Sequence, residues 1–103
     1  MTKALNLTLK KKWFDLVASG EKIREYRQRK PYWEKRFLDK NGFAIKFDEV
    51  HFKNGYGKNV PFLRVEWKTL AIIYGGDWPC EHGEIARDGD FVIHLGKILE
   101  LRV

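Results

Sequence analysis

The feature that most constrains the fold is a long β pattern in the second half of the chain. Between residues 61 and 74, the apolar residues Leu63, Val65 and Trp67 alternate with charged ones, and a continuous apolar run follows them. Side chains of a strand point to opposite faces in turn, so alternation of this kind predicts a β-strand. From Ile45 onward we therefore expect mainly β-structure.

Shorter runs of the same type predict the remaining strands. The expected elements are a strand at residues 4–9, a strand at 47–53, a glycine-rich hairpin loop at 54–59, a loop at 75–90, and two strands at 91–95 and 98–103. Near Asp48 the alternation of apolar and polar residues shifts by one position, so an irregularity of the strand is expected there. The last two strands would be separated by a turn at Gly96-Lys97.

Two short helices are expected before this β-rich part. Over residues 10–19 the spacing changes to that of a helix, with apolar residues on one stripe. Pro31 suits the first turn of a second helix, which would span residues 31–40 and end at Asn41-Gly42. Two helices with five or six strands predict an α+β fold, and we expect a small, twisted, barrel-like sheet.

The length and the cysteine content bound the kind of protein. A chain of 103 residues predicts a single domain over residues 1–103. One cysteine allows no internal disulfide, so a reducing, cytoplasmic environment is expected. The sequence has no apolar run near the roughly 18 residues of a membrane span, and its start alternates instead of forming a signal-peptide block. A soluble domain without membrane contact is therefore predicted.

Positive charge is concentrated in one segment. Residues 10–36 carry ten Lys or Arg and four acidic residues, and this excess equals the net charge of +6 of the whole chain. Such concentration favours a negatively charged partner, with nucleic acid or a nucleotide ahead of other candidates. The alternative is a solvated basic face that only keeps the protein soluble. The expected nucleic-acid patch comprises Arg29, Lys30, Lys35 and Arg36.

The same segment holds the stretch around which a ligand site is expected, Gly20-Glu21-Lys22-Ile23-Arg24-Glu25-Tyr26-Arg27. Gly20 suits the end of the first helix, and residues 22–28 are expected to form a strand. On that strand Ile23, Glu25 and Arg27 would share one face, which should be partly buried because it carries Ile23. A lysine, a carboxylate and an arginine beside a core favour a site. The alternative is a surface ion pair, which contributes only about 0–1 kcal/mol.

A cleft for a planar base also needs aromatic faces and polar partners. Tyr26, Tyr32 or Tyr56 could stack on a base, whereas Trp33 is expected to belong to the core. Lys22 and Arg27 suit contacts with phosphate or carbonyl groups of the ligand. The expected ligand-binding residues are Lys22, Arg24, Glu25, Tyr26, Arg27, Tyr32, Asn54 and Tyr56.

Several motifs follow one another in a recognisable order. A strand and a short helix with Trp-Phe precede Gly-x-Lys-x-x-Glu-x-Arg, then Asn-Gly-Tyr-Gly, then Gly-Asp before a terminal strand; here these are Gly20, Lys22, Glu25, Arg27, Asn54, Gly55, Tyr56, Gly57, Gly89 and Asp90. Together they resemble the ASCH family of PUA-like domains over nearly the whole chain. The resemblance implies a small PUA-like mixed β-barrel of about five to seven strands with two short helices. Its cleft would be lined by the first motif and would handle RNA or nucleoside-like ligands.

Two classes of function stay open. Some small ASCH members are amidohydrolases that deacylate N4-acylated cytidine with the motif lysine, a hydroxyl residue and a carboxylate; this chain has Glu25 where they carry threonine. As an enzyme, Lys22 would act as base or nucleophile while Glu25 shuttles a proton. As a binding module, the cleft would hold RNA or a nucleotide without chemistry. A nearby carboxylate favours the charged form of Lys22, so binding ranks first.

The sequence predicts neither a metal site nor a cofactor. Cys80 and His82 lie two residues apart, and such a pair does not supply the four ligands of a structural zinc site at a recognisable spacing. A Gly-x-Ser-x-Gly elbow, a P-loop and a dinucleotide fingerprint are also absent from the sequence.

Overall fold

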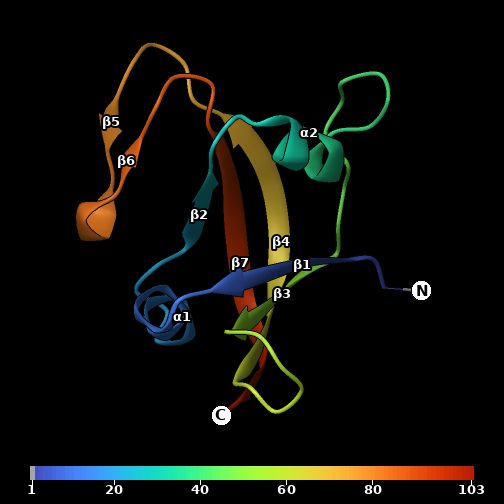
Figure 1. Cartoon of the computed structure of the whole chain (residues 1–103), viewed down its shortest axis with the longest axis vertical. Helices are drawn as coiled ribbons and strands as arrows, with labels where there is room; N and C mark the ends of the chain where they lie inside the picture. Colours follow the sequence, from blue (N-terminus) through green and yellow to red (C-terminus); the bar gives the residue numbers. More distant parts are fainter. Residues whose placement is uncertain (1) are drawn as a thin grey trace. The chain divides into compact units, whose positions relative to one another are not determined.

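The computed structural model describes residues 2–103 (Figure 1). Along these residues the elements are β1 (Ala4–Leu9), α1 (Lys11–Ala18), β2 (Arg24–Arg27), α2 (Pro31–Phe37), β3 (Glu49–Asn54), β4 (Phe62–Ile72), β5 (Trp78–Pro79), the 3-10 turn η1 (Glu81–Gly83), β6 (Ile85–Ala86) and β7 (Phe91–Arg102). Within this described range, five strands form a mixed sheet in the order β1-β3-β4-β7-β2, and β5 pairs with β6. The fold class is therefore α+β, as predicted, and is consistent with a small mixed barrel.

The chain divides into two compact units. The first contains the residues up to Ile23, Phe47–Lys68 and Leu95–Val103, and the second contains Arg24–Lys46 and Thr69–His94. Strands β4 and β7 each run from one unit into the other. Among residues 2–103, no helix is long and apolar enough to cross a membrane.

The first unit is built on the leucines of β1. Leu5, Leu7 and Leu9 are buried at alternate positions, which confirms the strand predicted for residues 4–9. β1 runs parallel to β3, and β3 pairs antiparallel with β4. Helix α1 buries Phe14 and Val17, so its apolar stripe is the face that it turns to the core.

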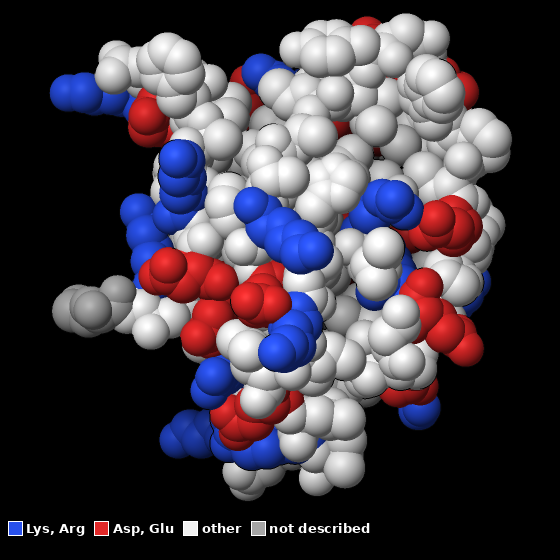
Figure 2. All heavy atoms as spheres, turned by 180° about the vertical axis from the view of Figure 1, so that it is seen from behind, with Lys and Arg blue, Asp and Glu red and all other residues white. Residues whose placement is uncertain are grey.

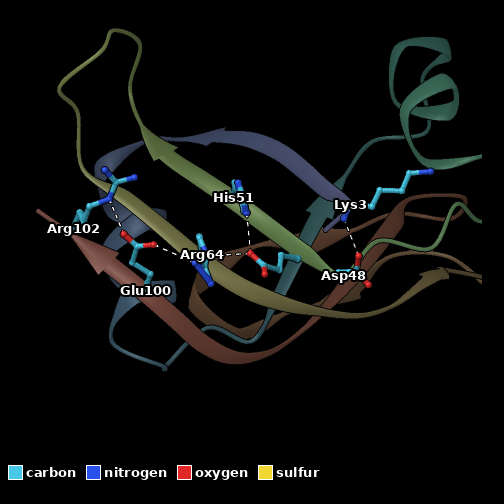
Figure 3. Close-up of polar contacts among 7 residues, drawn as sticks. Lys3, Asp48, His51, Arg64, Glu100 and Arg102 are labelled. Carbon is cyan, nitrogen blue, oxygen red and sulfur yellow. Dashed lines mark hydrogen bonds and ion pairs between the residues drawn. The ribbon is translucent and has the colours of Figure 1, made fainter. Parts of the chain in front are cut away.

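The irregularity expected near Asp48 marks the beginning of β3. The backbone N–H of Lys3 donates to the Asp48 carboxylate at 2.8 Å, and the Asp48 N–H donates back to the Lys3 carbonyl at 2.8 Å (Figure 3). The strand therefore begins at Glu49 instead of residue 47. β3 and β4 form the predicted hairpin, and the Asn54 N–H donates to the Pro61 carbonyl at 3.0 Å across its base.

A row of ion pairs crosses β3, β4 and β7 within the first unit (Figure 3). The Glu49 carboxylate lies 2.9 Å from a ring nitrogen of His51 and accepts from Arg64 at 3.0 Å. Arg64 also reaches Glu100 at 3.3 Å, and Arg102 pairs with Glu100 at 2.9 Å. Because opposite charges face each other across neighbouring strands, the row supports the strand order of this part of the sheet.

The prediction of two strands around a turn at Gly96-Lys97 is wrong, because β7 continues through both residues. A Cβ on Gly96 would lie 2.9 Å from Oε1 and 3.0 Å from Cβ of Glu66 on β4, closer than side chains pack. The Lys97 N–H donates to the same Glu66 oxygen at 2.8 Å. Glycine is therefore required here by the close approach of a neighbouring side chain and not by a turn.

In the second unit, β2 pairs antiparallel with the beginning of β7. Glu25 lies opposite Ile93, and Arg27 lies opposite Phe91. Helix α2 packs against this pair of strands through Phe37, whose ring meets that of Phe91 edge-on at a centroid distance of 5.1 Å. This packing places α2 on the face of β2 that carries Glu25 and Arg27.

The prediction that residues 75–90 are only a loop is wrong. Trp78 pairs with Ala86 in the β5–β6 hairpin, and the Cys80 N–H donates to the Glu84 carbonyl at 2.8 Å around η1. His82 in η1 has a φ of 64°, in the left-handed region. Each of these strands has two residues, which is too short to produce a visible alternation in the sequence.

Helix α2 is shorter than the predicted range 31–40, because Leu38 is already extended. The Asp39 side chain accepts the N–H groups of Asn41 and Phe43 at 2.8 and 3.0 Å. An aspartate that binds the backbone ahead of it stabilises a turn in competition with the helix. The chain therefore leaves the helix before the Asn41-Gly42 pair that was expected to end it.

Candidate functional site

The strand that carries the central motif is shorter than the predicted range 22–28. The Lys22 N–H donates to the Leu16 carbonyl at 3.0 Å, so this residue still belongs to the exit from α1 and precedes β2. Ile23 is 48% exposed, contrary to the expectation that it would help to bury its face. Glu25 is buried in its place, at a position in register with the core residue Ile93.

Glu25 and Arg27 form a buried ion pair. Arg27 Nη1 lies 3.1 Å from Glu25 Oε1, and the side chains are 15% and 3% exposed. The same guanidinium nitrogen donates to the Tyr26 carbonyl at 2.9 Å, while the Tyr26 N–H donates to the Glu25 carboxylate at 3.3 Å. Removing two charges from water costs several kcal/mol per ion. The alternative of an exposed surface ion pair is therefore wrong for these two residues.

The arginine of this pair also contacts an aromatic ring of α2. The Arg27 guanidinium lies 5.2 Å from the centre of the Trp33 ring, within reach of a cation–π contact. Trp33 stacks on Phe37 at 5.3 Å with an interplanar angle of 17°. Trp33 is half-buried and is not one of the fully buried core residues, and the Arg36 guanidinium also lies 5.9 Å from the centre of its ring.

The residues predicted as a nucleic-acid patch lie on α2 and the chain just before it. Tyr32 is 61% exposed, and the Arg36 guanidinium lies 5.5 Å from the centre of its ring. Arg29 pairs with Glu34 at 3.2 Å. We call this set the basic-aromatic surface; its members are the exposed Arg29, Lys30, Tyr32 and Lys35 and the half-buried Arg36. On the face shown in Figure 2, basic and acidic side chains are interspersed.

Three further predicted site residues, Lys22, Asn54 and Tyr56, lie in the first unit. Lys22 is 3% exposed, and its Nζ lies 5.5 Å from the centre of the Trp13 ring. Asn54 ends β3, and Tyr56 in the following loop is 90% exposed. Convergence of Lys22 with Glu25 and Arg27, and a rim formed by the Tyr56 loop, stay predictions.

The remaining two predicted residues, Arg24 and Tyr26, occupy the opposite face of β2 from Glu25. Arg24 pairs with Glu81 at 3.0 Å. Burial, and then a hydrogen bond with Cys80, raise the pKa of the Tyr26 phenol well above its ordinary value. These contacts separate Arg24 and Tyr26 from the buried pair, so the predicted ligand set does not form one group within the second unit.

Sequence reasoning missed a cavity on this opposite face. It has a volume of about 320 Å³ and is lined by Arg24 and Tyr26 together with residues of β4, the β5–β6 hairpin and β7. His94 is one of them, and burial followed by the charge of Arg24 lowers the pKa of its ring. The sequence signal was the spacing of Val92 and His94, which lie two residues apart on β7 and therefore on the same face of the strand.

Comparison of the chain with family models, with curated proteins and with solved structures found no match. In the part of the chain that the structure describes, no group of three or more His, Cys, Asp or Glu residues is placed to hold a metal ion. Function must therefore be inferred from the charged and aromatic side chains themselves.

Proposed function

We propose that the chain is a binding module of the ASCH type that holds RNA or a nucleotide on its basic-aromatic surface. The observation that carries this proposal is the exposed Tyr32 ring with the Arg36 guanidinium 5.5 Å from its centre. Aromatic faces beside cations are the usual means of holding single-stranded nucleic acid, since bases stack on the ring and phosphates meet the charges.

The neighbouring side chains support the same ligand. Lys30 and Lys35 are exposed, and the Pro31 start of α2 fixes both on one short segment with Tyr32. Arg27, behind this segment, is held by Glu25 and Trp33. An arginine with such fixed neighbours loses less conformational entropy when it meets a phosphate or a carbonyl group.

Salt dependence tests the proposal. Each phosphate neutralised on a single strand contributes about 0.7 to the slope of log affinity against log salt. The double variant Lys35→Gln/Arg36→Gln should therefore flatten the slope for a single-stranded RNA by about 1.4, with little change in preference among sequences. Binding can be measured by fluorescence anisotropy of a labelled RNA of about ten nucleotides, a length within the usual site sizes of such surfaces.

Lys97→Gln is the matched control, because Lys97 is an exposed lysine outside the basic segment. It should leave the slope unchanged. An affinity that is the same at low and physiological salt would contradict RNA binding through phosphates and would indicate a small neutral ligand.

An amidohydrolase acting on N4-acylated cytidine is the second candidate, and the burial of Lys22 favours it. Lysine is almost never fully buried without a specific partner, and buried lysines include many catalytic ones. In this reading the Lys22 amine either takes a proton from the water that attacks the acyl carbon or attacks that carbon itself. The bond between the acyl carbon and N4 breaks, Glu25 passes a proton to N4 of the released cytidine, and the acyl group leaves with water as a carboxylic acid.

The variant Lys22→Arg separates the two candidates. Arginine keeps the charge but does not lose its proton at working pH, so a reaction that uses the amine would stop. We expect instead that wild type does not hydrolyse N4-acetylcytidine and that Lys22→Arg weakens RNA binding by no more than about 1 kcal/mol, roughly fivefold, because Lys22 is not part of the basic-aromatic surface. Hydrolysis by wild type that is lost in Lys22→Arg, with RNA binding retained, would establish the enzyme. Chromatographic product analysis and anisotropy supply the two readouts.

A further inference from the structure

The cavity behind β2 has the composition of a site for a small apolar ring. Within the second unit, its walls include Ile73 from the segment after β4, Val92 from β7, and Trp78 and Pro79 from β5. Trp78 is 54% exposed although its Nε1–H donates to the Tyr74 carbonyl at 3.0 Å. The indole is thus fixed by a hydrogen bond and presents apolar surface at the cavity wall, as ligand sites commonly do.

The polar groups of the cavity carry no net charge. The Arg24 guanidinium is compensated by the Glu81 carboxylate at 3.0 Å. Burial and Arg24 lower the pKa of His94, so its ring is neutral at neutral pH. The raised pKa of Tyr26 keeps its phenol protonated. A charged ligand would lose hydration on entering this cavity without gaining an opposite charge.

We propose that this cavity binds an uncharged, planar aromatic molecule of one or two rings, stacked against Trp78 and hydrogen-bonded by polar side chains that line the cavity, which include Tyr26, Cys80 and His94. Its volume of about 320 Å³ is at the small end of ligand pockets and excludes a whole oligonucleotide. The site is independent of the proposed RNA surface, because Arg24 and Tyr26 lie on the other face of β2 from Glu25 and Arg27.

Three probes with one ring system test the class of ligand: indole, indole-3-acetate and tryptamine, which are neutral, anionic and cationic. In ¹⁵N NMR titrations, indole should shift the Trp78 side-chain N–H and the amides of Val92 and His94 with a dissociation constant of about 1 mM or tighter. Each charged probe should bind at least about tenfold more weakly. Equal or tighter binding of a charged probe, or no saturable shift with indole, would overturn the proposal.

Cys80 offers a second readout, since it is the single cysteine of the chain and lines the cavity. Saturating indole should slow the alkylation of Cys80 by iodoacetamide severalfold. The variant Ala71→Trp fills the cavity and should abolish both the indole shifts and the protection. Thr69→Trp is the control, because Thr69 is exposed on the same strand and does not line the cavity.

A second variant keeps the test decisive if Ala71→Trp does not fold. Trp78→Ala removes an exposed wall, so the fold should persist while indole binding weakens by at least about fivefold. Unchanged indole affinity in Trp78→Ala would overturn the proposal. RNA binding should be the same in both cavity variants and wild type, which separates failure of this site from failure of the basic-aromatic surface.

Discussion

Replacing Arg27 with methionine should lower the free energy of unfolding by about 3–5 kcal/mol, because the change breaks an ion pair whose carboxylate stays buried. The Glu25 side chain is 3% exposed and meets Arg27 Nη1 at 3.1 Å. Methionine retains most of the packing volume beside Trp33, so the decrease in the free energy of unfolding comes mainly from removal of the positive charge. Urea unfolding followed by circular dichroism measures the change.

Arg29→Met is the matched control, since Arg29 pairs with Glu34 at 3.2 Å with both side chains more than a third exposed. This exposed pair should contribute only about 0–1 kcal/mol. Adding Glu25→Gln to Arg27→Met should recover part of the lost stability, which a double-mutant cycle detects as coupling. If Arg27→Met costs no more than Arg29→Met, the buried pair does not stabilise the fold.

Replacing Tyr32 with alanine should weaken the binding of single-stranded RNA by about 1–3 kcal/mol, which is roughly 5- to 150-fold. The ring is largely exposed, so the free energy of unfolding should change little. Tyr32→Phe keeps the stacking face and should restore most of the affinity. Anisotropy titrations at one fixed salt concentration measure these differences.

Tyr74→Ala serves as the control, because Tyr74 is another strongly exposed tyrosine and lies away from the basic-aromatic surface in sequence. It should leave RNA affinity unchanged. Equal affinities for wild type, Tyr32→Ala and Tyr74→Ala would show that no base stacks on Tyr32 and would contradict the proposed surface.

Local patterns predicted those parts of the fold that depend on near neighbours. The alternating leucines of residues 4–9 predicted both ends of β1 correctly, and the glycine-rich loop predicted the β3–β4 hairpin. Gly96 was misread because a glycine can serve a turn or a close approach. Only Glu66, thirty positions earlier and on an adjacent strand, distinguishes these cases.

The sequence predicted those features of the candidate site that depend on neighbouring residues and missed those that depend on distant ones. The period of a strand put Glu25 and Arg27 on one face, and the structure joins them. Their burial depends on Ile93 and Phe91 of β7, and no pattern within residues 20–28 reveals that pairing. The contacts of Arg24 and Tyr26 could not be predicted, because their partners Glu81 and Cys80 come from a segment read as a loop.

The interleaving of the two units has a consequence for how the chain acquires its structure during synthesis. Neither unit is a continuous fragment: β1 pairs with β3 through Ala4 and Glu49, and β2 pairs with β7 through Arg24 and His94. These pairings close loops of roughly 45 and 70 residues, which makes folding slow compared with a local hairpin. On the ribosome, Glu25 and Arg27 therefore stay hydrated until β7 has emerged, and the buried charges are among the last groups to leave water.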